Sequence, residues 1–197
     1  VLLLSFLMPS PAAGADDTVL ADGFEKPWVS GYYVGYQRDQ YPIAEIDFSV
    51  VTHLMVGRVT PNADGTVATH FDIDPLAGPV WAREAAAAAH ACGARAVLMV
   101  GGAGEHAGWV GAAAPAHRAR FVASLLQAVD DLGYDGLDLD WEPLLPADQA
   151  DFRALAEALR AARPGLILTV PLGWINANFA EPVDPFYGAV APLFDQV

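Results

Sequence analysis

Short apolar runs alternate along the chain with stretches in which apolar residues recur every three or four positions. The extended runs predict strands at 28–36, 50–59, 94–100, 134–142 and 166–171, with the start of another at 194–197. The helical periodicity predicts a short helix after Pro42 and longer helices at 79–92, 116–132 and 147–163. We therefore expect five strand-helix units and part of a sixth.

The predicted helix ends and the composition of the strands agree with this frame. The three long helices stop at residues that commonly end helices, namely Gly93, Gly133 and the pair Pro164-Gly165. The run at 95–100 is apolar almost throughout, which is typical of a parallel strand covered by helices on both faces. The sequence therefore predicts an α/β fold built on a parallel sheet.

One predicted strand differs because every second residue in it is acidic. Three acids alternate with three apolar residues, Asp138, Asp140 and Glu142 with Leu137, Leu139 and Trp141. Side chains alternate across a strand that rises about 3.3 Å per residue, so the carboxylates share one face with Cα atoms about 6.6 Å apart. Repulsion and burial then raise the pKa of at least one of them. A carboxylic acid kept protonated near neutral pH can donate a proton in catalysis.

The acidic strand ends directly after its third acid. Pro143 has no backbone N–H to donate to a ladder, so Glu142 is the last residue that can pair. Ligands bind at the carboxyl ends of parallel strands, which places Glu142 at the mouth with Asp140 and Asp138 progressively deeper. A solvated acidic face and a calcium or magnesium site are the alternatives. The first does not explain Gly136 and the flanking leucines, and the second lacks the turn-forming spacing of a calcium loop.

The acidic strand resembles the signature of glycoside hydrolase family 18, the chitinases and endo-β-N-acetylglucosaminidases. The pattern Asp-x-x-Asp-x-Asp-x-Glu is matched by Asp135, Asp138, Asp140 and Glu142. The resemblance implies that Glu142 protonates the glycosidic oxygen while the acetamido oxygen of the substrate attacks the anomeric carbon. It also implies that Asp140 orients the acetamido group and that Asp138 shares a proton with its neighbour. Asp135 and the adjacent Gly136 then have a structural role.

The resemblance covers the chain from about residue 29 to the C-terminus and implies a (β/α)8 TIM barrel. It places two aromatic residues on one face of the first strand, Tyr32 and Tyr36, and a glycine pair at the end of the third, Gly101 and Gly102, all at the sugar site. Such a barrel takes about 250 residues. We therefore expect 28–197 to be an incomplete catalytic barrel, truncated after about five and a half β-α units.

A few positions depart from the family pattern, and the aromatic residues near strand ends differ in their expected roles. The family commonly has Ser, an aromatic residue and Tyr where this chain has Met99, Ala103 and Pro143. We expect Trp174, rather than Trp109, to stack on a sugar. Trp141 has the opposite parity to the acids and is expected to pack outward against helices.

Composition narrows the range of partners. The 197 residues are 54% hydrophobic and 17% charged, enough for one sizeable core. Ten Lys and Arg against 24 Asp and Glu give a net charge of −14, which disfavours nucleic acid and anionic membranes and suits a neutral polysaccharide. The single Cys92 cannot form an intrachain disulfide, and the five His residues lack metal-ligand spacing. We expect neither a metal nor another cofactor.

The first residues indicate export. An apolar run at 1–8 precedes prolines and small residues, which looks like a signal-peptide core and cleavage site. The run is far shorter than the about 20 residues that cross a bilayer. We interpret 1–15 as a signal-peptide remnant and 16–27 as a linker, and expect a secreted protein without membrane contact after cleavage. A buried N-terminal strand is the alternative.

At its other end the chain stops where the sixth strand of the family begins. The resemblance then implies that a Tyr and an Asp from that strand, and a Trp from the eighth, are missing from the sugar site. An open parallel sheet has unpaired edges and uncovered apolar faces. We expect 16–197 alone to aggregate or bind a partner and to hydrolyse nothing, and the full-length protein to be a monomer.

Other functions compete with this interpretation. The segment 102–107 fits the loose Gly-x-Gly-x-x-Gly/Ala dinucleotide pattern, but we expect Gly111 and Pro115 to interrupt its helix, and no acid follows about 20 residues on. A chitin-binding lectin of the same fold is the non-enzymatic alternative, although such proteins typically lose the acid and Glu142 is present. We interpret the chain as a secreted retaining glycosidase that cuts β-1,4 linkages after N-acetylglucosamine in chitin, with N-glycan cores as the alternative substrate.

Overall fold

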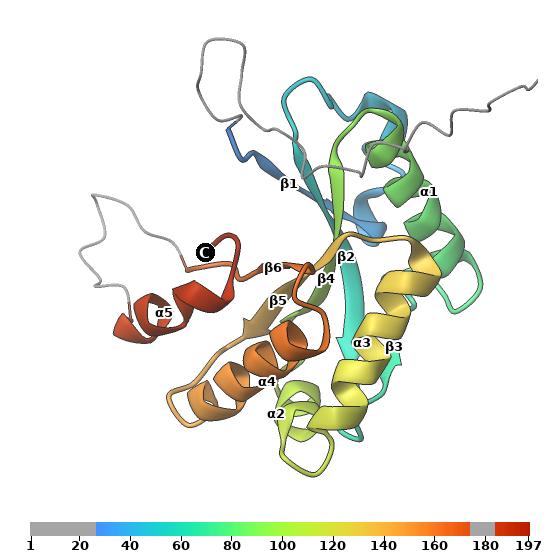
Figure 1. The fold of residues 1–197 in the computed structure, drawn as a ribbon. Coiled ribbons are helices and arrows are strands. Elements are labelled where there is room, and N and C mark those ends of the chain that lie inside the picture. The colour runs from blue at the N-terminus through green and yellow to red at the C-terminus, as the bar shows by residue number, and fades with distance from the viewer. Residues whose placement is uncertain (1–26, 174–183) are drawn as a thin grey trace, which may run out of the picture.

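The computed structural model describes residues 27–173 and 184–197, which form an open sheet flanked by helices (Figure 1). Five parallel strands are hydrogen-bonded in the order β1-β2-β4-β5-β6. Their bounds are Ser30–Val34, His53–Pro61, Arg95–Ala103, Gly136–Glu142 and Ile167–Thr169. A short strand, β3 (Val67–Ala68), pairs antiparallel with β2. The parallel sheet predicted from the apolar runs is confirmed.

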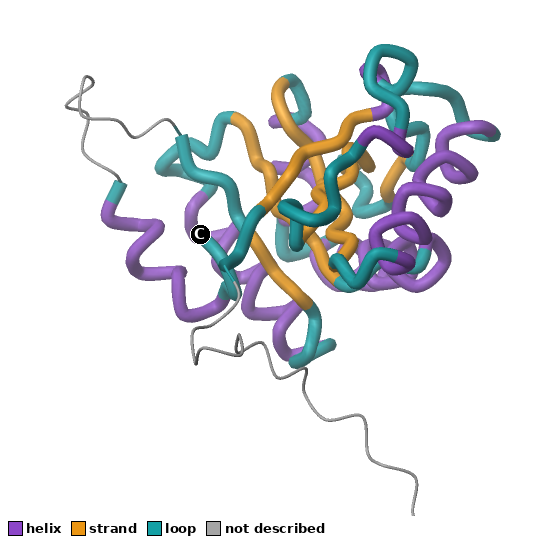
Figure 2. Tube along the Cα trace, turned by 90° about the horizontal axis from the view of Figure 1, so that it is seen from above, coloured by secondary structure: helices purple, strands orange, loops and turns teal. Residues whose placement is uncertain are grey.

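Helices line the outside of this sheet (Figures 1 and 2). The helices are α1 to α5, at Ala77–Ala91, His106–Ala113, Arg118–Leu132, Gln149–Ala162 and Pro185–Val190. Three short 3-10 turns complete the described elements, η1 (Gly35–Gln37), η2 (Ile43–Glu45) and η3 (Ala191–Leu193). Helix α3 contacts both α1 and α4, so these three helices form one continuous layer.

The main core lies between the sheet and this helical layer. Helix α1 presents Ala82, Ala85 and Ala89, spaced three and four residues apart, and all three are fully buried. From the sheet, Leu137 and Leu139 of β5 are also fully buried. Burying one leucine side chain contributes about 2 kcal/mol. The odd positions of β5 thus anchor the strand in the core and leave its even positions to the opposite face.

Several strand ends differ from their predicted positions, and two of them affect residues predicted for the site. Strand β1 ends at Val34, so Tyr36 lies in η1 and the prediction that it shares a strand face with Tyr32 is wrong. The chain turns at Gly35, where a Cβ would lie 1.9 Å from the carbonyl oxygen of Phe71. Strand β4 continues past its predicted end to Ala103, because the glycine pair still pairs with β5.

The prediction that Gly111 interrupts the helix after β4 is also wrong. Helix α2 runs through Gly111 to Ala113. The glycine lets α2 pack closely against Ala63, because a Cβ at this position would lie 2.5 Å from the Cβ of Ala63. The tertiary contact therefore outweighs the weak helix propensity of glycine.

The two margins of the sheet remain apart. Gln196 forms a parallel bridge with Thr169 of β6, which agrees with the predicted start of a strand at 194–197. Within 27–173 and 184–197 the strands do not close into a barrel.

No helix of these ranges is both long and apolar enough to cross a bilayer. The interpretations of 1–15 and 16–26, and that of Trp174, lie outside the described residues.

Candidate active site

The three acids of β5 lie on one face of the sheet and differ in depth. In the parallel register they stand beside Met99, Gly101 and Ala103 of β4. Asp138 is 1% exposed and Asp140 is 6% exposed, whereas Glu142 at the end of the strand is exposed. The predicted order of depth is confirmed, and Glu142 is the acid that solvent reaches.

Asp138 is held from both sides by hydroxyl groups. The phenol of Tyr32 on β1 donates to its Oδ2 at 2.9 Å, and the hydroxyl of Thr169 on β6 donates to its Oδ1. Burial raises the pKa of Asp138, and these two hydrogen bonds oppose the rise. The deepest acid is therefore fixed in orientation by the strands at both margins of the sheet.

Asp140 has the electrostatic surroundings of a group that keeps its proton. Burial, a hydrogen bond with Glu142 and the charges of Glu142 and Asp138 raise the pKa of Asp140 from 3.8 to about 8, against the opposing charge of Arg58. At neutral pH Asp140 thus retains its proton, in a hydrogen bond with Glu142. The site therefore has a protonated carboxyl group, that of Asp140, directly beside its exposed acid.

The two tyrosines predicted for the sugar site have different environments. Tyr32 is 52% exposed, although its hydroxyl donates to Asp138, so about half of this residue is open to solvent beside the acid row, the three acids of β5. Burial of its hydroxyl and then the charge of Asp138 raise the pKa of Tyr32 above its ordinary range. Tyr36 is 61% exposed on η1 and makes no contact with the acids in the described structure. The structure therefore brings Tyr32, and not Tyr36, to the acids.

The glycine pair shapes the end of β4. Gly101 and Gly102 have φ of 88° and 90°, a left-handed conformation that glycine adopts without strain. A Cβ on Gly101 would lie 2.1 Å from Nε1 of Trp109 and 2.6 Å from the carbonyl oxygen of Asp140. The pair lets the backbone pass between the acid strand and α2, which explains why glycines stand there.

The first residues of the motif are structural. Asp135 accepts from the backbone N–H of Ala96 at 2.8 Å, is hydrogen-bonded to His90 at 2.7 Å and forms an ion pair with Arg95 at 3.3 Å. These contacts tie the amino end of β5 to α1 and β4, at the opposite end from Glu142. At Gly136 a Cβ would lie 2.2 Å from the carbonyl oxygen of Ile167, so glycine permits the close pairing with β6.

Two tryptophans, Trp109 and Trp141, support the site from behind. Trp109 of α2 and Trp141 of β5 stack with ring centroids 5.1 Å apart, and they are 0% and 5% exposed. Trp141 therefore packs outward against helices, as predicted. Trp109 is too deeply buried to stack on a sugar. His106 extends this bracing, because it pairs at 2.8 Å with Asp148, whose carboxylate also accepts from the N–H of Leu145 in the loop after Glu142.

Several residues of the site were not predicted from the sequence. Thr169 and Arg58 belong to this group, and so does Tyr187 on α5. A cavity of about 360 Å³ adjoins the acids, and its lining includes Asp140, Glu142, Pro143, Leu144, Pro171, Leu172 and Tyr187. Burial, then the charges of Asp184, Asp140 and Glu142, raise the pKa of Tyr187, which places its phenol near the acids. No local sequence signal marks these residues, since each comes from a different element.

The arrangement suits proton transfer at a solvent-accessible point. Among residues 27–173 and 184–197, no group of three or more His, Cys, Asp or Glu side chains is arranged to hold a metal ion. One exposed carboxyl group is supported by two buried ones, of which one retains a proton. General acid catalysis needs this combination of access and a raised pKa.

Comparison with known proteins identifies the family. A family model described as glycosyl hydrolases family 18 matches residues 29–173. The chain belongs to this family. The match includes Asp138, Asp140 and Glu142 and the segment 102–107, of which Gly102 lies at the end of β4, so the dinucleotide alternative is not supported.

Solved chitinases of the family share this fold. The Group IV chitinase of Ostrinia furnacalis, in complex with allosamidin, superposes with a TM-score of 0.69 at 24% identity, covering 85% of this chain and 49% of that chain. A family 18 chitinase of Cycas revoluta superposes with a TM-score of 0.67 at 22% identity, covering 86% and 53%. The chain thus spans about half the length of these structures, and its open sheet corresponds to part of their (β/α)8 TIM barrel.

A curated relative is similar in sequence as well. A protein named chitinase-like effector from Moniliophthora roreri is 27% identical over 156 residues, which are 76% of this chain and 33% of the relative. The chain therefore spans about a third of that relative.

Proposed function

We propose that this protein hydrolyses β-1,4 linkages of N-acetylglucosamine polymers, with chitin as its substrate, by a retaining mechanism in which Glu142 is the general acid and base. One observation carries the proposal. An exposed carboxyl group ends a strand beside a second, buried carboxyl group whose pKa is raised to about 8. A proton is thus available at neutral pH at the place where a substrate can reach it.

The first chemical step moves that proton. Glu142 donates it to the glycosidic oxygen, and the bond between this oxygen and the anomeric carbon breaks. The acetamido carbonyl oxygen of the substrate forms the new bond to the anomeric carbon, which gives an oxazolinium ion. Water then attacks the anomeric carbon from the opposite face and gives a proton to Glu142. The bond between the anomeric carbon and the acetamido oxygen breaks, which restores the acetamido group, and the configuration is retained.

The buried acids assist this step. Asp140 orients the acetamido group, and passing its shared proton toward Glu142 leaves a negative charge beside the developing oxazolinium cation. Such preorganised charge is worth most in a site that excludes water. Asp138, held by Tyr32 and Thr169, keeps Asp140 in place and adds to the negative potential.

The choice of substrate rests on the family and on the names of its solved members. Chitinases of Ostrinia furnacalis and Cycas revoluta are described in complexes with allosamidin, and a Cycas revoluta chitinase variant in a complex with (GlcNAc)4. Endo-β-N-acetylglucosaminidase action on N-glycan cores is the alternative substrate choice. The name of the chitinase-like effector favours, as a second candidate, a protein that binds chitin without cleaving it. The presence and exposure of Glu142 favour catalysis.

The decisive experiment replaces Glu142 by Gln in the full-length protein. The amide cannot donate a proton in the same way, so we expect turnover of N-acetylglucosamine oligomers to fall by at least about 100-fold while their binding is preserved. Turnover is measured by chromatography of the products and binding by calorimetry. Glu84→Gln on the exposed side of α1 is the matched control.

The outcomes separate the candidate functions. Unchanged turnover in Glu142→Gln would remove this residue as the acid. Binding without turnover in the unmodified protein would favour the binding protein over the enzyme. Deacetylated oligomers are expected to react far more slowly, and equal rates with both substrates would exclude participation of the acetamido group.

A further inference from the structure

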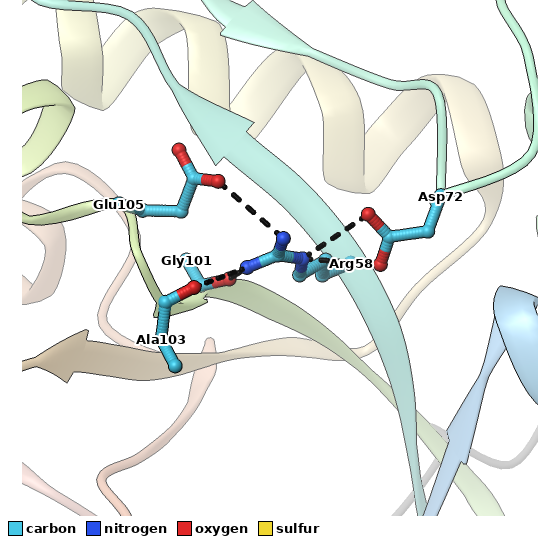
Figure 3. A network of polar contacts seen from close by, with 5 residues as sticks. All are labelled: Arg58, Asp72, Gly101, Ala103 and Glu105. Atoms are coloured by element: carbon cyan, nitrogen blue, oxygen red, sulfur yellow. Dashed lines mark hydrogen bonds and ion pairs between the residues drawn. The ribbon is translucent and has the colours of Figure 1, made fainter.

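Arg58 is the centre of a polar network at the mouth of the site (Figure 3). Its Nη1 donates to the carbonyl oxygens of Gly101 at 2.8 Å and Ala103 at 3.2 Å. Its Nε lies 3.1 Å from Asp72, and its Nη2 lies 3.4 Å from Glu105. The guanidinium therefore bridges the carbonyl oxygens at the end of β4 and two carboxylates from different loops.

The backbone of β2 directs the Arg58 side chain toward the site. The register between β2 and β4 shifts between Val56 and Val59, the short segment that contains Arg58. Such irregularities redirect a side chain and are frequent beside active sites. The Arg58 side chain is only 22% exposed, and those of Asp72 and Glu105 are 28% and 26% exposed. The network is thus less exposed to solvent than ordinary surface ion pairs, which contribute little to protein stability.

The geometry of the guanidinium matters for the backbone that it holds. A guanidinium is planar and offers its N–H groups in a fixed fork, which an ammonium group cannot reproduce. Here one nitrogen spans two carbonyl oxygens of the glycine-pair segment while the other two reach carboxylates. Arg58 therefore fixes the conformation of 101–103, where Gly101 and Gly102 adopt left-handed φ values.

The same guanidinium lies close to the acid row. A Cβ on Gly102 would lie 3.2 Å from Nη1 of Arg58 and 3.5 Å from Oδ2 of Asp140. Because glycine has no side chain, nothing from this residue separates the cation from the carboxyl group. The other ionisable groups that act on Asp140 or feel its charge are Asp138 and Glu142 on its own strand, Tyr32 on β1 and Tyr187 on α5.

We propose that Arg58 is a positioning residue of this site, which fixes the glycine-pair backbone and places a positive charge close to the carboxyl group of Asp140. The role rests on the proposed function, because it acts through the proton shared by Asp140 and Glu142. Arg58 itself does not reach the substrate, since its donors are directed to the protein. It sets the pH range in which the shared proton is available.

The test compares Arg58→Met and Arg58→Lys in the full-length protein, with Arg153→Met on the exposed face of α4 as the matched control. Carbon-13 spectra of the carboxyl groups report the titration midpoint of Asp140 without any need for turnover. We expect Arg58→Met to raise this midpoint by about one pH unit, because an opposite charge is lost. Arg58→Lys keeps the charge and should leave the midpoint nearly unchanged.

Amide hydrogen exchange reports the second part of the role. Both Arg58 variants should speed exchange at Gly102 and Ala103 by at least about fivefold, because neither Met nor Lys provides the fork. An unchanged midpoint in Arg58→Met would overturn the electrostatic role. If that variant does not fold, Arg58→Lys still decides the positioning role, which unchanged exchange at the amides of Gly102 and Ala103 would overturn.

Enzyme kinetics separate this proposal from the hydrolase proposal. Activity should be lost as pH rises through the pKa of the acid pair, so Arg58→Met should shift that alkaline limb upward by about the same one pH unit. A purely structural defect would lower the rate without moving the limb. If the unmodified protein shows no turnover but the Asp140 midpoint still moves, the hydrolase proposal fails and the role of Arg58 stands.

Discussion

Asp138 shows how a single buried carboxylate depends on residues far away in the sequence. Its two oxygens accept hydrogen bonds from the hydroxyl groups of Tyr32 and Thr169, which lie on strands at opposite margins of the sheet. A buried carboxylate without such partners would be strongly disfavoured. The two hydroxyls therefore permit an acid to lie at this depth in the fold.

Replacing Thr169 by Val tests this support. Val keeps the shape of the side chain but removes the donor, so Oδ1 of Asp138 loses its partner at a fully buried position. We expect the free energy of unfolding to fall by about 1–3 kcal/mol and the pKa of Asp138 to rise further. Urea unfolding and a carboxyl titration by nuclear magnetic resonance measure the two effects.

Thr169→Ser is the matched control, because it retains the hydroxyl and loses only a methyl group. Its loss of stability should be clearly smaller than that of Thr169→Val. Equal losses in the two variants would mean that packing of the methyl group, and not the hydrogen bond, determines the effect.

The acids could be predicted from the sequence, but their partners could not. The alternation of Asp138, Asp140 and Glu142 with apolar residues is a local pattern with a direct geometric meaning. Thr169 and Arg58 stand in strands of ordinary composition, and only the order of the strands brings them to the acids. Such contacts between distant segments leave no periodic signal.

At the scale of elements, the glycine pair and α2 determine how the end of β4 fits behind the acids. Gly101 lies against the indole of Trp109, and that indole in turn stacks on Trp141 of the acid strand. The end of β4, α2 and β5 therefore pack as one unit. A side chain at Gly101 would disturb all three elements.

We expect Gly101→Ala to lower the free energy of unfolding by more than about 2 kcal/mol. The added Cβ meets Nε1 of Trp109 at 2.1 Å in a backbone with φ of 88°, and both the overlap and the left-handed conformation are unfavourable. Thermal unfolding followed by circular dichroism measures the change. Gly165→Ala is the control, since a Cβ there meets nothing within 4 Å. Similar effects at the two positions would refute the account of the glycine pair.

The elements that the sequence predicted well are those with long, regular patterns. The strands and the helices α1, α3 and α4 lie close to their predicted ranges because apolar periodicity reports burial directly. Helix α2 was not predicted as a continuous helix because Gly108 and Gly111 serve contacts with the β2–β3 hairpin. Helix α5 is a single short segment capped by Asp184, which accepts from the N–H of Phe186 at 2.9 Å. Segments of this length carry little periodic information.

At the scale of the whole molecule, the acid row lowers the free energy of unfolding of the protein. The chain carries a net charge of −14, and folding brings three of its acids together in a partly buried site. Asp140 illustrates the conflict, since its pKa is raised from 3.8 to about 8 in the folded protein. Active sites commonly retain such unfavourable groups because function requires them.

The pH dependence of stability should reveal this conflict. Between about pH 4 and pH 8 the folded protein retains the proton of Asp140, whereas the unfolded chain has released it, so this residue makes the free energy of unfolding fall as pH rises. Asp140→Asn removes the effect. Relative to the unmodified protein, we expect the variant to gain little at pH 4 and at least about 1 kcal/mol at pH 8, because one pKa unit corresponds to about 1.4 kcal/mol.

Urea unfolding at pH 4, 6 and 8 measures this difference, and Asp131→Asn on the exposed face of α3 is the control. Other carboxylates also affect the pH dependence, since hydrogen bonds from Ser49 and Thr66 hold the pKa values of Asp47 and Asp64 low. These groups are unchanged in the variant and cancel in the comparison. A stability difference that stays constant from pH 4 to pH 8 would mean that Asp140 ionises in the folded protein as it does in the unfolded chain. Asp140 would then hold no proton beside Glu142 at neutral pH.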